Sequence, residues 1–258
     1  MRTITIIASE LAKVTGHNKY GDKTDTLNKV LKRNKLSDVY IPKSNVESDL
    51  LKMDKEDIST IKKELKLQST ASVSDIEKAI KTTVLKGTLD KDITESASKG
   101  KVDAVLKKCP TLKKTLDKGI KQDLQMKRGN VKEDSNLNVT QSRNNIKIGS
   151  RNSEMYNKIL YEDPDGEFRI NLCGKIDGLT NDCVVETKNR TKRLFHSIPV
   201  YEKVQMEAYM FLTGYNKALH IECYNEEQNK TDYVHDNVLW KTCVDRTIAY
   251  VTDILLQV

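Results

Sequence analysis

The sequence predicts an α/β protein with a central mixed β-sheet flanked by helices. Alternating apolar and polar residues indicate half-buried strands at 168–172 and 217–224, and a short apolar run at 183–185 indicates another strand. Strongly helical segments follow at 199–214 and 238–256, each with one apolar face. Strands and helices in this order are typical of α/β and α+β proteins.

Composition divides the chain into three predicted parts. Residues 1–21 contain a short helix, which Ser9 would cap and Gly16 would end. Residues 22–120 are rich in lysine and show several weak amphipathic helices, so we expect a helical insertion or subdomain there. Residues 121–258 hold most of the predicted strands and the longer helices, and they would form the main part of the core.

Bulk properties limit the class of protein. The chain has 258 residues, 37% of them hydrophobic and 31% charged, and its five cysteines form no CxxC pair. No run approaches the roughly 18 apolar residues of a membrane span, and the N-terminus lacks the features of a signal peptide. We therefore expect an intracellular protein with free thiols and no membrane partner. The net charge of +7 permits a polyanionic partner but does not identify one.

Chemically informative residues lie in the segment 174–190, GKIDGLTNDCVVETKNR. Asp177 follows the strand at 168–172, while Glu186 and Lys188 follow the next apolar run. The turn residues between these strands predict an antiparallel hairpin. Residues two apart in a strand share a face, so Glu186 and Lys188 would point the same way, with Asp177 opposite them.

Two carboxylates beside an ammonium suit the hydrolysis of a phosphodiester with a divalent ion, because Mg²⁺ prefers oxygen ligands. Asp177, Glu186 and the carbonyl of Thr187 are the predicted ligands, and Glu133 could bring a carboxylate to a second metal ion. Lys188 would orient or help to deprotonate the attacking water. The spacing alone is weak evidence, since acids and lysines recur by chance in a chain of this charge.

Further predicted site residues flank this segment. Gln205 and Tyr209 are four apart on the helix at 199–214 and share a face, although Tyr209 could equally be an aromatic residue at the edge of the core. Four cations near the predicted centre would contact DNA phosphates, namely Arg128, Arg190, Lys192 and Arg193. The structural alternative for Lys192 and Arg193 is a solvated edge.

Taken in order, these motifs resemble the lambda-exonuclease/YqaJ-like branch of the PD-(D/E)xK nucleases. The resemblance covers residues 1–21 and 121–225. It rests on ASELAKVTGHNKY, on MKRGNVKEDSNL with Glu133, on GKIDG with Asp177, on VVETK with Glu186 and Lys188, and on YEKVQMEAYMF with Gln205 and Tyr209. It implies that these six residues form the catalytic set. Residues 22–120 depart from the family, because that segment is longer than expected there.

The resemblance implies a restriction-endonuclease-like core and a Mg²⁺-dependent deoxyribonuclease, with Mn²⁺ expected to substitute. It further implies a 5′–3′ exonuclease on double-stranded DNA with a free end, in recombination or repair and of phage or viral type. The expected partners are DNA, a single-strand annealing protein and further copies of the chain, and a viral protein of a eukaryotic host would be cytoplasmic or nuclear. An endonuclease of the same fold and a catalytically inactive DNA-binding protein are the alternatives.

Overall fold

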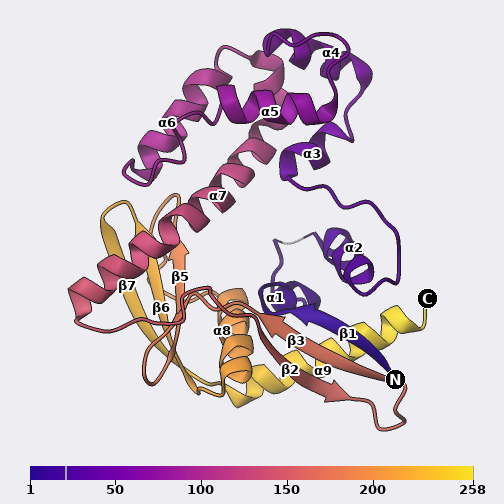
Figure 1. Ribbon diagram of the computed structural model, residues 1–258, viewed down its shortest axis with the longest axis vertical. Helices are drawn as coiled ribbons and strands as arrows, with labels where there is room; N and C mark the ends of the chain where they lie inside the picture. The colour runs from indigo at the N-terminus through magenta and orange to yellow at the C-terminus, as the bar shows by residue number, and fades with distance from the viewer. Residues whose placement is uncertain (21, 258) are drawn as a thin grey trace.

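The computed structural model describes residues 1–20 and 22–257. Gly21 and Val258, which are the last residues of two predicted ranges, lie outside the described residues. Two small mixed sheets pack against common helices, and a separate helical unit extends away from them (Figure 1). This arrangement confirms the predicted α/β class, with one correction. The strands form two sheets where a single central sheet was predicted, because the chain breaks the strand ladder after residue 174.

The first sheet has the strand order β1-β3-β2. Its strands are β1 (Arg2–Ile7), β2 (Tyr156–Glu162) and β3 (Phe168–Gly174). β1 runs parallel to β3 and β2 runs antiparallel to it. The sequence analysis missed β1, although its alternation places Ile4 and Ile6 fully in the core. The predicted short helix follows directly, as the 3-10 helix η1 (Ala8–Glu10) and α1 (Leu11–Val14).

The second sheet has the order β4-β5-β6-β7. Its strands are β4 (Gly178–Leu179), β5 (Val184–Asn189), β6 (Lys217–Tyr224) and β7 (Glu227–Val234). β5 is parallel to β6, and the other two pairs are antiparallel. The predicted hairpin between residues 168–172 and β5 was therefore wrong, because those residues belong to the first sheet. The hairpin partner of β5 is the two-residue strand β4.

Two helices cover the sheets as predicted. α8 (Val200–Thr213) begins after Pro199 and ends at Gly214, whose φ of +83° is a left-handed conformation that glycine adopts without strain. α9 (Asn237–Leu255) closes the chain. Both helices and α2 (Lys23–Arg33) bury residues in the core between the sheets. α2 therefore packs with the sheets, although it falls in the predicted insertion.

A helical unit with its own core occupies the top of Figure 1. It consists of α3 (Asn45–Leu50), α4 (Lys55–Glu64), α5 (Val73–Thr83), α6 (Glu95–Leu106) and the first half of α7 (Pro110–Asn144). α7 begins at Pro110, which suits a first helical position because proline lacks an N–H donor. The predicted boundary between residues 120 and 121 falls inside this helix. No helix in the described part of the chain is long and apolar enough to cross a membrane.

α7 joins the helical unit to the second sheet. Its first half contributes Leu112, Leu116 and Ile120 to the core of the helical unit, whereas Leu137 packs with Val185 of β5 in a third small core. One continuous helix thus runs from the helical unit past β5 and across the second sheet, where Thr140 contacts Gln228 of β7 (Figure 1). Cys109, Cys223 and Cys243 are buried, Cys173 and Cys183 are half-buried, and all five are free thiols, as predicted.

Arg128 on α7 has a structural role, which corrects its predicted contact with DNA. Its side chain is 1% exposed and is fully engaged inside the protein. Nε donates to Oε1 of Glu95 at 2.7 Å, and the remaining guanidinium donors reach the backbone carbonyls of Thr88, Asp90 and Ile93. A buried guanidinium with these partners cannot reach a phosphate. It holds the loop before α6 against α7.

We expect Arg128→Ala to lower the free energy of unfolding by about 3 kcal/mol or more, because it leaves the buried Glu95 carboxylate without its cation. Urea denaturation followed by circular dichroism measures this change. Lys114→Ala, on the exposed side of the same helix, is the matched control and should leave stability unchanged. An Arg128→Ala protein with unchanged stability but weakened DNA binding would restore the phosphate-contact prediction.

Candidate active site

The open edge of β5 forms the site. β4 pairs only with Val184 and Val185, so β5 has no neighbouring strand on this side from Glu186 onward. On the other side, β6 pairs with β5 along its whole length. The short β4 therefore leaves backbone groups of β5 free to meet side chains or a ligand.

Asp177 occupies the first free position of this edge. It lies directly before β4, and its Oδ2 accepts a hydrogen bond from the backbone N–H of Thr187 at 2.8 Å. The N–H and C=O of one residue point to the same edge of a strand, so the Thr187 carbonyl also faces the open side. Asp177 lies opposite Glu186, as predicted, although the hairpin that brings it there is β4–β5.

Glu186 and Lys188 point to one face of β5, as their spacing predicted. Glu186 is 1% exposed, and the ammonium of Lys188 contacts its Oε1. Apart from this ammonium, neither carboxylate oxygen of Glu186 has a hydrogen-bond partner among the described residues. A buried carboxylate with so few donors is costly and is a common feature of sites that bind a cation.

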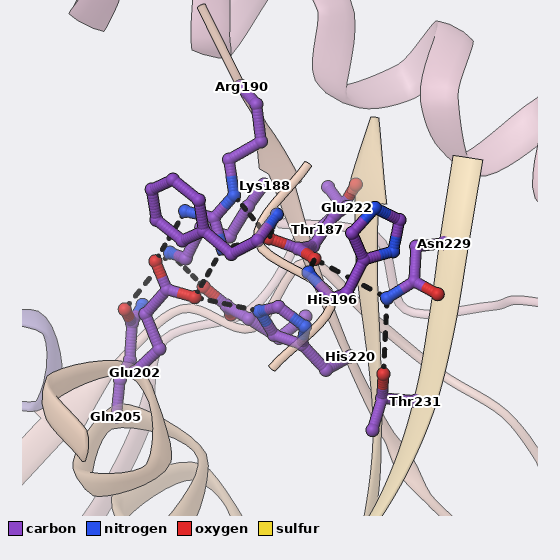
Figure 2. A network of polar contacts seen from close by, with 12 residues as sticks. Thr187, Lys188, Arg190, His196, Glu202, Gln205, His220, Glu222, Asn229 and Thr231 are labelled. Atoms are coloured by element: carbon purple, nitrogen blue, oxygen red, sulfur yellow. Dashed lines mark hydrogen bonds and ion pairs between the residues drawn. The ribbon is translucent and has the colours of Figure 1, made fainter. Parts of the chain in front are cut away.

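α8 supplies a polar relay to Lys188. Lys188 donates to Oε1 of Gln205 at 3.1 Å, and Nε2 of Gln205 donates to the hydroxyl of Tyr209 at 2.9 Å. Gln205 and Tyr209 share a helix face, as predicted, and both turn toward β5. Figure 2 shows Gln205 reaching Lys188 from α8. Tyr209 is buried at the end of this relay.

Glu133 approaches the site from α7. Together with Asp177, Glu186, Lys188 and Gln205 it lines a cavity of about 410 Å³, called the β5 cavity below. Its Oε1 accepts a hydrogen bond from Asn152 at 3.0 Å. The structure thus brings the six predicted catalytic residues to one place, five of them in the cavity lining and Tyr209 behind Gln205.

Crowding of buried acids raises their pKa values. Burial raises the pKa of Glu186 to about 7, with a further increase from the nearby Asp177 carboxylate. Burial also raises the pKa of Asp177 to about 6, against the opposing effect of Lys188. Burial raises the pKa of Glu133 as well. Burial therefore disfavours the ionised forms of all three acids, and a cation placed among them would favour those forms.

Lys188 and Tyr209 respond to the same acids. Burial alone would lower the pKa of Lys188, but the carboxylates of Glu186 and Asp177 outweigh it and raise the pKa above its ordinary value. Burial, together with Glu186 and Asp177, raises the pKa of Tyr209 well above 10. At neutral pH, Lys188 is therefore an ammonium and Tyr209 a neutral phenol.

Arg190 has a structural role, which corrects its predicted contact with DNA. It is buried, and its Nη1 and Nη2 each donate to one oxygen of Glu202 at 2.7 Å (Figure 2). Its Nε donates to Glu222 at 2.6 Å, and its guanidinium stacks on the ring of Phe195. These bonds engage Nε, Nη1 and Nη2 with carboxylates, so the guanidinium is held in an ion-pair network. Arg190 ties β5 to α8 and β6.

Sequence reasoning missed the residues that complete this network, the acids Glu202 and Glu222 and the imidazole of His220. His220 donates from Nε2 to Glu202 at 2.9 Å, because an ionised carboxylate only accepts. β6 places His220 beside Glu186 and Glu222 beside Lys188 in register. The alternation in KALHIECY contained this signal, since His220 and Glu222 lie two apart on one strand face.

Lys192 and Arg193 follow β5 and are exposed. They line a second cavity of about 500 Å³, called the cationic cavity below, with Asn18 of the N-terminal segment. Lys188 and Gln205 line both cavities, so the two meet at the site. The predicted contact of Lys192 and Arg193 with phosphates stays a prediction.

Oxygen donors at the open edge of β5 fit a Mg²⁺ ion. No group of three or more His, Cys, Asp or Glu side chains within residues 1–20 and 22–257 is placed to hold a metal ion. Two carboxylates, Asp177 and Glu186, and the free-edge carbonyl of Thr187 are available, and Mg²⁺ commonly takes one or two carboxylates and completes its shell with water. The unpartnered oxygens of Glu186 fit such a ligand role.

Comparisons with known proteins found similarity only to solved structures. No family model matches the chain, and no curated protein matches it. The chain is similar to an alkaline exonuclease (LHK-Exo) from Laribacter hongkongensis, with 14% identity, a TM-score of 0.40, and coverage of 70% of this chain and 93% of the other. It is also similar to a phage-related exonuclease from Haemophilus somnus 129PT, with 14% identity, a TM-score of 0.39, and coverage of 98% and 96%.

We expect Glu202→Gln to lower the free energy of unfolding at pH 7 by about 3 kcal/mol, since it removes one partner of a buried ion pair while Glu222 still pairs with Arg190. Burial would raise the pKa of Glu202, but hydrogen bonds from His220 and Arg190 outweigh it and lower the pKa to about 2. The stability from its ionisation is therefore present above the ordinary pKa near 4.5 and is lost as the pH falls toward 2.

Urea denaturation of the unaltered protein and of Glu202→Gln between pH 2.5 and 8 measures this dependence. The difference between them should be largest above pH 5 and should shrink as the solution becomes more acidic. Lys241→Ala, which removes an exposed ion pair with Asp245, is the control and should show almost no difference at any pH. A pH-independent difference for Glu202→Gln would contradict the proposed charge pairing.

Proposed function

We propose that this protein is a Mg²⁺-dependent deoxyribonuclease of the PD-(D/E)xK type, in its lambda-exonuclease/YqaJ-like branch. One observation carries the proposal. Asp177, Glu186 and Lys188 converge on the open edge of β5, with both oxygens of the buried Glu186 lacking any donor other than Lys188. A core would avoid such an arrangement, whereas hydrolysis with a bound cation requires it.

Asp177, Glu186 and the Thr187 carbonyl would hold the ion. When bound, Mg²⁺ supplies positive charge for the phosphate oxygens and for the leaving oxygen. Its charge would also favour the ionised forms of Asp177 and Glu186, whose pKa values are raised by burial and by a neighbouring carboxylate, Glu133 for Asp177 and Asp177 for Glu186. Glu133, on the opposite wall, would hold water or a further ion as the scissile phosphate enters.

Lys188 acts as an ammonium in this proposal. Its raised pKa makes it a poor base at neutral pH, so it orients the attacking water by donating a hydrogen bond and offsets charge on the phosphate. Gln205 accepts from Lys188 at 3.1 Å and fixes the direction of the ammonium. Tyr209 accepts from Gln205 and thereby fixes the amide, so the two residues of α8 position Lys188.

The order of the sequence motifs also favours a particular kind of deoxyribonuclease. We propose a 5′–3′ exonuclease on double-stranded DNA with a free end, acting in recombination or repair. The neighbouring cationic cavity, with Lys192 and Arg193, provides room and charge for the backbone beyond the scissile phosphate. A single-strand annealing partner and a homo-oligomer stay predictions of the sequence resemblance.

We expect Lys188→Ala to lower the rate of DNA hydrolysis by at least about a hundredfold, because it removes a donor that acts in the transition state. Binding of the same DNA in Ca²⁺, measured by fluorescence anisotropy, should change little. Lys217→Ala, at the start of β6, is the control and should cleave normally. Undiminished cleavage by Lys188→Ala would remove this residue from the mechanism.

Glu186→Gln should weaken metal binding while keeping the shape of the side chain. We expect the Mg²⁺ concentration for half-maximal activity to rise by about tenfold or more, because one anionic ligand is lost. Isothermal titration with Mn²⁺ in the absence of DNA measures the same loss directly. Excess EDTA should abolish cleavage, and Mg²⁺ or Mn²⁺ should restore it. An unchanged metal dependence in Glu186→Gln would contradict the proposed role of this residue as a metal ligand.

End-labelled linear duplexes and a sealed circular duplex separate exonuclease from endonuclease. We expect mononucleotides to appear from the 5′-labelled strand of the linear duplex, and the sealed circle to stay intact. Lys188→Ala protein in the same assay controls for contaminating nucleases. Rapid cutting of the circle would favour the endonuclease alternative, and binding without any cleavage would favour the inactive DNA-binding protein.

A further inference from the structure

One wall of the β5 cavity is a strip of uncharged amides on α7, opposite the carboxylates of the site. This amide strip consists of Gln122, Gln125, Asn130 and Asn136, and all four residues line the cavity. Gly129, which lines the cavity between them, has no atom within 4 Å of the position of a Cβ, so the wall is open at its middle. The spacing of these residues follows one face of α7.

The amide groups of this strip are free to bind a ligand. Gln122, Gln125 and Asn130 make no side-chain hydrogen bond to any described residue, and all three are exposed. Nδ2 of Asn136 is buried without a partner in the described structure. By contrast, the amide of the neighbouring Asn45 donates to Asp123 at 2.7 Å. A buried donor without a partner, facing a cavity, indicates a ligand that accepts a hydrogen bond there.

Charge is segregated between the two cavities that meet at Lys188. α7 carries six lysines, at 113, 114, 118, 121, 127 and 132, and the described lining of the β5 cavity includes none of them. The cationic cavity holds Lys192 and Arg193 instead. A phosphate only accepts hydrogen bonds and favours cations, so its natural side is the cationic cavity.

We propose that the amide strip binds the nucleobase of the nucleotide next to the scissile phosphate, while the adjoining backbone runs into the cationic cavity. A carboxamide offers both donors and an acceptor, which suits the mixed edges of a base better than a phosphate, since a phosphate only accepts. Free amides that rotate to match different edges bind any of the four bases. The cavity of about 410 Å³ is large enough for one nucleotide. This inference rests on the proposed nuclease function and adds a substrate subsite to it.

Coupling between the amide strip and the base tests the proposal. We suggest measuring binding of a labelled duplex end by fluorescence anisotropy in EDTA, with an abasic residue placed in turn at each of the first four nucleotides. Gln122→Ala/Gln125→Ala should weaken binding of the intact duplex by about tenfold. At one abasic position, the same substitutions should weaken binding by less than about twofold, because the contacted base is already absent.

Two further variants control for charge and for folding. Lys192→Ala/Arg193→Ala should weaken binding of intact and abasic duplexes equally and should reduce its salt dependence. Lys114→Ala, on the exposed side of α7, should change neither the affinity for either duplex nor its salt dependence. An equal loss on intact and abasic DNA for the double amide variant, or no loss on either, overturns the base subsite. Failure of the unaltered protein to cleave any DNA with Mg²⁺ contradicts the proposed function instead, since the binding comparison in EDTA does not depend on hydrolysis.

Discussion

Matching of buried charge around β5 is the constraint on which the rest of the structure depends. Glu186, Glu202 and Glu222 are each at most 3% exposed, and Lys188 and Arg190 are the cations that face them. An unpaired charge at such burial would cost several kcal/mol, so the register of β5 with β6 and the rotation of α8 cannot vary independently. Arg190 meets this constraint completely, with a bidentate contact to Glu202 and a further bond to Glu222.

Glu186 meets the same constraint only in part, and this difference separates structure from function within one strand. Its carboxylate has Lys188 as its only donor among the described residues, and it shares the open edge with Asp177. Burial raises the pKa values of both acids, with further increases from Asp177 on Glu186 and from Glu133 on Asp177. The Arg190 network, shown in Figure 2, pairs Arg190 with both Glu202 and Glu222. Its stability can offset the cost of the incompletely neutralised acids Asp177 and Glu186.

The length of α7 determines what surrounds the site. A two-residue β4 leaves the edge of β5 open, and α7 crosses this edge on its way from the helical unit to the second sheet (Figure 1). The same helix contributes Glu133, the amide strip and Leu137, and Arg128 ties it to the loop before α6. The helical unit therefore forms one wall of the β5 cavity through α7.

Local sequence alone determined several features of this protein. Alternation predicted β3 and β6, and the apolar stripe with its Pro199 and Gly214 boundaries predicted α8. Spacing placed Glu186 with Lys188, and Gln205 with Tyr209, on shared faces. These features depend on backbone periodicity, which neighbouring residues set. β1 was missed although its alternation was present, because its pairing partner β3 lies more than 160 residues away.

Only the tertiary structure decided which charged residues are available. The sequence predicted all four cations as phosphate contacts near the site. In the structure, Arg128 and Arg190 are buried with carboxylates, whereas Lys192 and Arg193 are exposed. Glu95, Glu202 and Glu222, the acids that make this difference, come from distant elements that only packing brings together. Likewise, the sequence predicted that Asp177 would face Glu186, but the fold chose β4 as the strand that brings it there. Chain-distant contacts set burial, and burial decides whether a charge holds the fold or is available to a ligand.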